Sequence, residues 1–447
     1  MTTSENRARV AAIEVALEAR WPETRIAPTL ERISALVDIL GSPQLAYPTI
    51  HVAGTNGKTT TARMIDALMG ATGMRTGRFT SPHLEDMLER IAINNQLIEP
   101  KDFIFAYNDI APYLDLMDLK FENPISFFEA ITAMAFVAFA EFPVDIGVIE
   151  AGMGGEWDAT NVVESSVSVI TPIGLDHMQY LGNTLAEIAH TKAGIIKPGS
   201  MVVLARQEPE AAVELLRRAA QVGADVAREG IEYFLESRAV AVGGQLLTIK
   251  GLAGKYEDIF LPLHGKHQGA NAASALVAVE AFFGGQELDP EAVHAGFAAV
   301  SSPGRCEIVH REPTVILDAA HNPHGAKALA ETLENEFTFD EIIGVFGVFA
   351  DKDVEGILVA LEPVLNVLIV TASSSSRAMK TEDVKRIADR IFGSERVIKI
   401  DHLEDALKQA LADARRPLSD VSVGVVVTGS VVTVGEARAI VKRLSAK

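Results

Sequence analysis

The sequence predicts a two-domain α/β fold, in which a larger N-terminal domain has a mainly parallel sheet and a smaller C-terminal domain is Rossmann-like. Three observations support this prediction. Strand-like and helix-like patterns alternate along most of the chain. The 447 residues exceed one ordinary domain, and 48% of them are hydrophobic, which is enough for two cores. The segment SSPGR, residues 301–305, is typical of a linker and gives domains 1–300 and 301–447.

The N-terminal domain is expected to begin with two helices, at 7–20 and 29–40, the second of which ends at Gly41. A buried strand over 47–53 then leads through a glycine-rich turn into another helix. Residues 72–84 are rich in Gly, Thr, Ser and Pro, so we expect an ordered surface loop there.

The remaining elements follow from the period of the apolar residues. In the N-terminal domain we expect helices at 126–142, 184–199, 268–283 and 289–300, strands at 145–155 and 167–173, and short strands with glycine turns over 225–262. In the C-terminal domain we expect strands at 314–320, 341–348, 366–373, 396–400 and 423–429, separated by helices.

Composition narrows the class of protein. A net charge of −20 argues against general affinity for nucleic acid, because phosphates would be repelled. The single cysteine, Cys306, forms no internal disulfide, and no signal segment precedes the first helix, so we expect a cytoplasmic protein. The longest apolar run, 130–140, is too short to span a bilayer, so we expect no membrane association. We also expect a monomer.

The stretch VAGTNGKTTT, residues 52–61, lies between the buried strand and a helix and is typical of a phosphate-binding loop. The strict pattern is not met, because Val52 occupies the first glycine position and the turn depends on Gly54 and Gly57. In such a loop Lys58 reaches the outer phosphates and the Thr59 hydroxyl binds magnesium. The alternative is a glycine turn that only caps the helix.

Further polar residues follow the ends of predicted strands. Thr59 follows the first strand, Glu150 ends the next, and His177 comes shortly after the third. Since ligands of parallel α/β sheets bind beyond the carboxyl ends of the strands, these side chains are candidates for one Mg²⁺ site. The alternatives are a structural role for Glu150 and simple hydrogen bonding for His177. Lys192, considered on its helical pattern alone, is typical of a solvated surface charge.

In the C-terminal domain, the stretch LDAAHNPHG places Asp318, His321 and Asn322 at a strand-to-helix turn. A turn of this form is typical of a ligand-binding loop. An Asx-type helix cap is the alternative.

Seven motifs in order, GTNGKTT, SPHL, EAGMGGEWDATN, LDHMQYLG, KAGIIKPG, HQGANAASAL and LDAAHNPHG, resemble those of the folylpolyglutamate synthase/dihydrofolate synthase family in the muramyl-ligase superfamily. The resemblance implies ATP-dependent addition of L-glutamate to dihydropteroate and to reduced folates. ATP would phosphorylate the carboxylate, and the amine would then displace phosphate from the acyl phosphate.

The resemblance also implies roles for individual residues. ATP would be contacted by Asn56, Gly57, Lys58, Thr59, Asn271, Arg305 and Asp318. Magnesium would be held by Thr59, Ser81, Glu150, His177 and Lys192, the last as an N6-carboxylated lysine, which turns a repelling cation into an anionic ligand. The catalytic set would be Lys58, Lys192 and His321.

Two stretches align with folate-contacting segments of the family. They are Phe127, Phe128 and Glu129, and Trp157, Asp158 and Ala159. The usual pattern Gly-Leu-Gly-Gly-Arg-Leu-Asp is altered here by Met153, Glu156 and Trp157, which bears on how pteroate or the glutamate tail is recognised.

Three other functions remain open. The chain could extend folate tails only, as a folylpolyglutamate synthase. A muramyl-type amino-acid ligase shares the loop, but such enzymes usually carry a UDP-binding domain ahead of it, and 53 residues precede Gly54. A nucleotide-binding switch that hydrolyses ATP without ligation has the same kind of loop.

Overall fold

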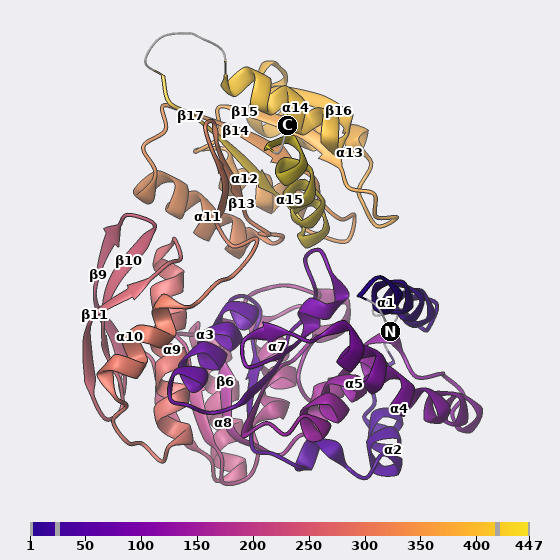
Figure 1. The fold of residues 1–447 in the computed structure, drawn as a ribbon. Coiled ribbons are helices and arrows are strands. Elements are labelled where there is room, and N and C mark those ends of the chain that lie inside the picture. The colour runs from indigo at the N-terminus through magenta and orange to yellow at the C-terminus, as the bar shows by residue number, and fades with distance from the viewer. Residues whose placement is uncertain (1–2, 23–26, 416–420, 446–447) are drawn as a thin grey trace. The chain divides into compact units, whose positions relative to one another are not determined.

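The computed structural model describes residues 3–22, 27–415 and 421–445. The chain divides into two compact units (Figure 1). Unit 1 comprises Met1–Arg238, Leu246–Leu261 and Ala270–Val300, and unit 2 comprises Ala239–Gln245, Pro262–Gly269 and Ser301–Lys447.

Unit 1 contains an eight-stranded sheet in the order β4-β3-β2-β5-β1-β6-β7-β8. The six neighbouring strands β2, β5, β1, β6, β7 and β8 are parallel to one another. Strands β3 and β4 form an antiparallel edge beside β2. Their bounds are β1 (Thr49–Ala53), β2 (Thr76–Phe79), β3 (Ile91–Ile93), β4 (Gln96–Leu97), β5 (Ile146–Glu150), β6 (Ser165–Ile170), β7 (Met201–Leu204) and β8 (Asp225–Arg228). The prediction of a mainly parallel sheet is confirmed.

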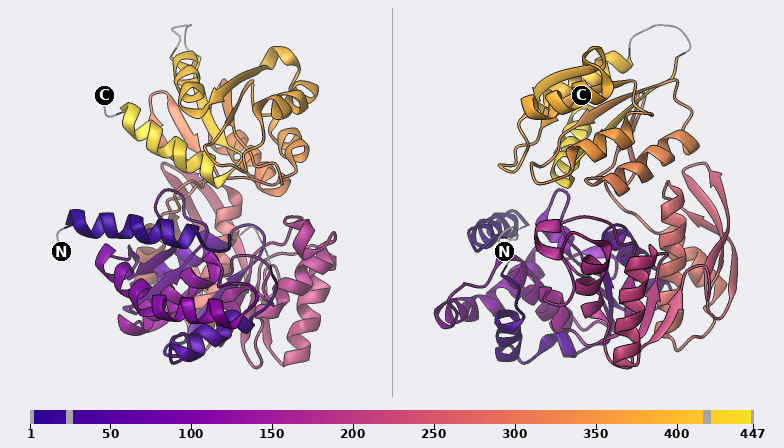
Figure 2. Two further views of the ribbon diagram at one scale, coloured as in Figure 1. Left: turned by 90° about the vertical axis from the view of Figure 1, so that its right-hand side faces the viewer. Right: turned by 180° about the vertical axis from the view of Figure 1, so that it is seen from behind.

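Helices cover both faces of this sheet (Figure 2). The helices before β9 are α1 (Thr3–Glu18), α2 (Glu31–Ile39), α3 (Lys58–Ala71), α4 (Pro100–Lys120), α5 (Phe127–Glu141), α6 (Met178–Leu181), α7 (Leu185–Lys192) and α8 (Pro209–Val222). Neighbouring residues of β2 show which helix lies on which face. Gly77 faces the Phe139 ring of α5, whereas Arg78 pairs with Asp66 of α3. Because side chains alternate along a strand, α5 and α3 lie on opposite faces.

A second, three-stranded sheet has the order β11-β10-β9, with β9 (Phe234–Ala241), β10 (Gly244–Lys250) and β11 (Lys255–Leu261). The helices that follow it are α9 (Lys266–Phe282) and α10 (Pro290–Ala298). Helix α10 packs against both α3 and β11. The predicted strands over 225–262 and the two helices after them are therefore confirmed.

Helix α5 illustrates how the sequence sets an element that lies near the site. The Ser126 hydroxyl accepts from the Glu129 amide, and the Glu129 carboxylate accepts from the Ser126 amide, which is a capping box. Every residue from Glu129 to Phe139 is buried, as expected for a helix that is apolar on nearly all sides.

The loop predicted over 72–84 is wrong, because residues Thr76–Phe79 form the buried strand β2. Two residues conceal this strand in the sequence. Gly77 is required because a Cβ there would lie 2.6 Å from the Phe139 ring. Arg78 is polar in sequence, yet its Nη1 donates to Asp66 Oδ2 at 2.6 Å and the pair is buried.

The buried Arg78–Asp66 pair gives a stability prediction. Asp66→Ala leaves the Arg78 guanidinium buried without its carboxylate, and we expect a loss of about 3–5 kcal/mol in the free energy of unfolding. Urea unfolding of the two proteins measures it. Arg7→Ala, which removes the exposed Arg7–Asp86 pair, is the control and should leave the midpoint unchanged. Equal midpoints for Asp66→Ala and the unmodified protein would contradict the prediction.

Unit 2 contains a six-stranded sheet in the order β12-β13-β17-β14-β15-β16. All neighbours are parallel except β12, which is antiparallel to β13. The strands are β12 (Glu307–Arg311), β13 (Thr314–Leu317), β14 (Glu341–Phe346), β15 (Val367–Ala372), β16 (Val397–His402) and β17 (Val423–Thr428). The five predicted strands and the Rossmann-like class are confirmed, whereas β12 was not predicted.

The helices of unit 2 are α11 (Pro323–Glu336), α12 (Val354–Leu361), α13 (Thr381–Phe392), α14 (Leu403–Ala414) and α15 (Val431–Ser445). Within the described ranges of both units, no helix is long and apolar enough to cross a membrane.

Candidate functional site

The glycine-rich loop joins β1 to α3 in a conformation that requires its glycines. Gly57 caps α3 with φ +88°, in the left-handed region that favours glycine. A Cβ at Gly54 would lie 1.9 Å from the Thr171 hydroxyl oxygen. The amides of Thr55 and Asn56 donate to Pro172 O at 3.0 and 3.3 Å. The loop is thus held against the end of β6 and leads directly into the N-terminus of a 14-residue helix.

Two lysine side chains meet at this loop. Lys58 Nζ donates to Gly54 O at 3.1 Å and to Thr55 O at 3.3 Å, and Lys192 Nζ donates to the same Gly54 O at 2.8 Å. The structure therefore brings together two predicted catalytic residues that are 134 positions apart in sequence, 192 minus 58. Two basic side chains therefore converge on one carbonyl oxygen of the loop that is expected to bind phosphate.

Lys192 is buried, with 4% of its surface exposed, so the interpretation of this residue as a solvated surface charge is wrong. Burial and the neighbouring Lys58 lower the pKa of Lys192 to about 7, and Asp176 and Asp158 oppose that shift. Asp176 was not among the residues predicted for the site. Its only signal was its position directly before His177 in the motif LDHMQYLG.

Oxygen donors converge beside the lysines. The Thr59 hydroxyl donates to Glu150 Oε1 at 2.8 Å, and the Ser81 amide donates to Glu150 Oε2 at 3.1 Å. Glu150 ends β5 directly beside Val52 of β1 and is 1% exposed. A carboxylate and hydroxyls are hard oxygen donors that suit Mg²⁺. In the described part of the chain, no three or more His, Cys, Asp or Glu residues are grouped so that they could hold a metal ion by themselves, and Mg²⁺ needs no such cage.

The segment that carries His177 is attached to the same loop. The Thr55 hydroxyl donates to Gly174 O at 3.0 Å, and the Gly174 amide donates back to the Thr55 oxygen at 3.0 Å. His177 itself has φ +50° and caps the short helix α6. Its amide donates to Asp176 Oδ1 at 2.8 Å. The structure thus brings this segment to the phosphate loop, as expected from the strand ends.

Asn271 on α9 also lies at the loop. A Cβ on Gly57 would lie 2.8 Å from Asn271 Oδ1, and Asn271 is 6% exposed. The amide side chain is therefore placed against the turn that begins α3, where the resemblance placed an ATP contact.

The first predicted folate stretch is largely built into the core. Phe127 is buried with the Arg90 guanidinium 4.9 Å from its ring centroid. Phe128 is half-buried and touches the position of Gly152, where a Cβ would lie 2.5 Å from its ring. Glu129 forms the α5 capping box and a buried ion pair with Arg32 at 3.0 Å, contacts that suffice to explain its burial.

The second predicted folate stretch forms a turn between β5 and β6. Trp157 is half-buried and packs with Gly154, and Ala159 is buried. Asp158 is 3% exposed and accepts from the amides of Met153 and Thr160 and from the Thr160 hydroxyl. Burial raises the pKa of Asp158, and these hydrogen bonds oppose the rise.

In unit 2, Asp318 lies directly after β13. Its carboxylate accepts from the amides of Cys306 and Ala320 at 2.8 and 2.9 Å. Burial raises the pKa of Asp318, and Arg305 opposes that rise most strongly. Arg305 Nη1 donates to Ala319 O at 3.4 Å, and His321 Nδ1 lies 2.9 Å from the same oxygen. The turn therefore gathers Arg305, Asp318 and His321.

Asn322 acts as a helix cap, which was the alternative considered for this turn. Its side chain accepts from the Gly325 amide at 2.8 Å and caps α11. The helix cap and the polar cluster coexist, so the cap does not by itself explain Asp318.

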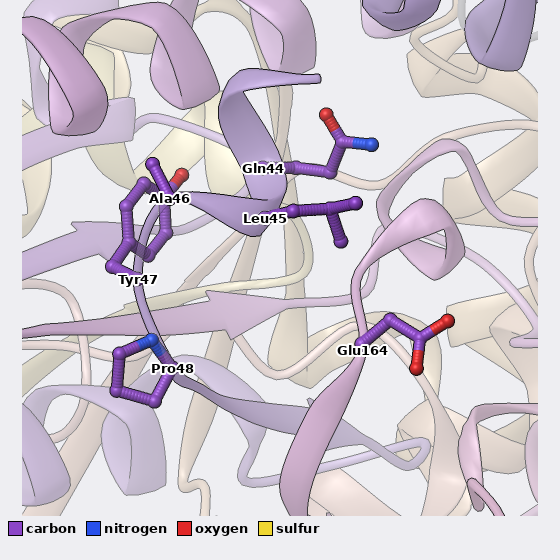
Figure 3. Close-up of a pocket in the computed structure, with 6 residues that line it drawn as sticks. All are labelled: Gln44, Leu45, Ala46, Tyr47, Pro48 and Glu164. Atoms are coloured by element: carbon purple, nitrogen blue, oxygen red, sulfur yellow. The ribbon is translucent and has the colours of Figure 1, made fainter.

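One pocket lies at the amino end of β1, whereas the phosphate loop follows its carboxyl end (Figure 3). It has a volume of about 290 Å³ and is lined by Gln44, Leu45, Ala46, Tyr47, Pro48 and Glu164. None of these residues was predicted for the site.

Comparison with known proteins agrees with this arrangement. The family described as "Mur ligase middle domain" matches residues 52–279, and the family described as "Mur ligase, glutamate ligase domain" matches residues 304–431. A relative from Mycobacterium tuberculosis named dihydrofolate synthase/folylpolyglutamate synthase is 50% identical over 465 residues, which cover 99% of this chain and 96% of that protein.

Solved structures give the same result. Mycobacterium tuberculosis folylpolyglutamate synthase complexed with ADP matches with a TM-score of 0.94 and 50% identity, covering 98% of this chain and 99% of that one. The bifunctional folylpolyglutamate synthase/dihydrofolate synthase from Yersinia pestis, complexed with AMPPNP and a Mn ion, matches with a TM-score of 0.83 and 28% identity, covering 97% and 98%.

The middle and glutamate-ligase domains together define the class, which is that of the Mur ligases. Within that class the chain belongs to the dihydrofolate synthase/folylpolyglutamate synthase family, as the motif resemblance indicated.

Proposed function

We propose that this protein is an ATP-dependent ligase that joins L-glutamate to dihydropteroate and to reduced folates through an acyl phosphate. The observation that carries the proposal is the convergence of Lys58 and Lys192 on Gly54 O, beside the Thr59–Glu150 pair. The names of the relatives, which include both dihydrofolate synthase and folylpolyglutamate synthase, support both activities.

The proposed reaction has two steps. The folate carboxylate attacks the γ-phosphorus of ATP, which forms an acyl phosphate and releases ADP. The glutamate amine then attacks the acyl carbon, loses a proton, and expels phosphate that carries one former carboxylate oxygen. A free carboxylate is a poor electrophile, and its conversion to an acyl phosphate supplies a leaving group that the amine can displace.

The loop would bind the triphosphate near the N-terminus of α3, with Asn56 and Gly57 among its contacts. Lys58 would leave the loop carbonyls and neutralise charge on the transferring phosphoryl group, an electrostatic effect that dominates such reactions. Asn271, Arg305 and Asp318 complete the proposed ATP contacts, and His321 belongs to the proposed catalytic set.

The oxygen donors of Thr59, Ser81 and Glu150, with His177, fit Mg²⁺, which when bound would neutralise charge on the phosphate oxygens. We include N6-carboxylated Lys192 in this set. A neutral lysine amine adds to CO₂, loses a proton and becomes a carbamate anion. Burial of Lys192 beside Lys58 disfavours its ammonium form and thereby favours the amine that this reaction needs.

Phe127, Phe128 and Glu129 and the turn containing Trp157, Asp158 and Ala159 are kept as the proposed folate-binding segments. Aromatic faces suit a flat pterin ring. We likewise keep the domain division 1–300 and 301–447 and a monomeric state as proposals.

ADP release tests the function directly. Reactions contain Mg²⁺ and L-glutamate with either 7,8-dihydropteroate or a tetrahydrofolate, and matched reactions omit glutamate or the pteroyl substrate. We expect ADP with both pteroyl substrates and almost none in the omissions. Turnover with tetrahydrofolate alone would reduce the function to tail extension, and equal ADP in all reactions would indicate an ATP-hydrolysing switch.

Arg305 provides a separate prediction for the ATP contacts. Arg305→Ala removes a charged donor from the proposed nucleotide site and should raise the KM for ATP about 10-fold, the effect of losing one hydrogen bond to a charged group. Steady-state kinetics with ATP varied measures it. Arg311→Ala on β12 is an exposed control that should change nothing. Equal KM values for both variants would exclude Arg305 from the site.

A further inference from the structure

A buried hydrogen-bond chain connects the nucleotide strand to the turn proposed to bind folate. His51 lies on β1, three residues before Gly54, and is fully buried. Its Nε2 lies 2.8 Å from the Thr160 hydroxyl oxygen, and that hydroxyl lies 2.5 Å from Asp158 Oδ1. The other carboxylate oxygen, Oδ2, accepts from the Met153 amide at 2.7 Å.

The direction of the hydrogen bonds follows from counting protons. Thr160 has one hydroxyl proton, which it donates to the Asp158 carboxylate. The Thr160 oxygen therefore accepts a proton from His51, so the imidazole carries its hydrogen on Nε2. Within the described part of the chain, His51 Nδ1 is buried without a hydrogen-bond partner, which agrees with this tautomer. Burial lowers the pKa of His51 to about 3, so the ring is neutral.

The turn at the Asp158 end of the hydrogen-bond chain packs against the segment that contains Lys192. The Glu156 amide donates to Thr191 O at 2.8 Å. A Cβ on Gly155 would lie 2.7 Å from Lys192 O. On its other side, the turn touches the Phe128 ring at Gly152.

We propose that His51 and Thr160 are positioning residues for the ligation reaction: through Asp158 and the Met153 amide, they hold the 152–158 turn in register with the strand that carries the phosphate loop. This inference rests on the proposed function. Neither side chain touches the reactants. Their effect is to fix the pteroyl substrate relative to the γ-phosphate, since small misplacements of reacting groups are costly.

Paired variants in the full-length protein test this inference. Thr160→Val removes the hydroxyl at almost constant volume, and His51→Leu removes the donor. Both should lower kcat/KM for dihydropteroate about 10- to 100-fold while the KM for ATP stays within about 2-fold. Thr160→Ser retains the hydroxyl and should restore the activity lost in Thr160→Val. The double variant His51→Leu/Thr160→Val should be no worse than the poorer single variant, because both break one chain.

Thr132→Val is the matched control, since the Thr132 hydroxyl is also buried but has no hydrogen-bond partner among the residues that the structure describes. It should retain full activity. The inference is overturned if Thr160→Val is as active as Thr132→Val, if Thr160→Ser fails to restore activity, or if the KM for ATP rises in parallel with that for dihydropteroate. Failure of the proposed function itself would look different, because the unmodified protein would then show no glutamate-dependent ADP release. Direct measurement of ATP binding by the variants shows whether they keep an intact nucleotide site.

Discussion

Lys58→Ala is expected to lower kcat for glutamate ligation about 100- to 1,000-fold, the cost of removing one group that stabilises developing charge in the transition state. In the structure, Lys58 begins α3 and its Nζ donates to Gly54 O and Thr55 O within the loop. Binding of the triphosphate would replace these carbonyl contacts with phosphate contacts. ADP release in the presence of both substrates measures the effect.

The fold should persist in this variant, because the named hydrogen bonds of Lys58 lie within its own loop. Circular dichroism and the thermal midpoint check that point. Lys101→Ala is the control, since Lys101 is an exposed helix lysine that pairs with Glu99. Activity of Lys58→Ala equal to that of Lys101→Ala would remove the nucleotide site from this loop.

Lys192 is also expected to be important for catalysis, but for a different reason. Lys192→Ala should lower kcat about 100-fold, the upper range for loss of a group that supports a metal site. Lys192→Arg should be as poor, because arginine keeps a cation but does not form a carbamate. Added short carboxylic acids should restore part of the activity of Lys192→Ala, since they supply the missing anion in the vacated space.

Carboxylation itself is measured by ¹³C NMR of protein equilibrated with ¹³CO₂. We expect a carbamate resonance that is absent from Lys192→Arg and present in Lys197→Arg. Lys197 is a suitable control because it is half-buried, follows the same helix, and has a lowered pKa. Full activity of Lys192→Arg, or a resonance that persists in it, would exclude carboxylated Lys192 from the reaction.

Much of the fold could be predicted because most elements bury one continuous apolar face. The five predicted strands of unit 2 are runs of Val, Ile and Leu between turns, and their period is legible in the sequence. The period of strand β2 is not legible, because its polar Arg78 is buried in an ion pair with Asp66, 12 residues earlier on α3. Helix α4 was also missed. It has Pro112 in its interior, a residue that normally indicates a helix end.

Some residues of the candidate site could likewise be predicted from the local sequence, and others could not. Lys58 and Thr59 follow from a local motif, and Glu150 follows from its position at a strand end. Lys192 does not follow from local pattern. Its burial depends on Gly54 O, which is 138 residues away in sequence, and only the resemblance identified it. The His51–Thr160–Asp158 chain likewise joins residues 109 positions apart, so only the folded structure contains that signal.

Isotope transfer tests the central claim most directly. Dihydropteroate labelled with ¹⁸O in its carboxylate is incubated with ATP, Mg²⁺ and L-glutamate, and the phosphate produced is analysed by mass spectrometry. Ligation through an acyl phosphate predicts that one ¹⁸O atom enters phosphate for each amide formed. Phosphate free of label, with ADP still released, would show that ATP is hydrolysed by water and would contradict the account.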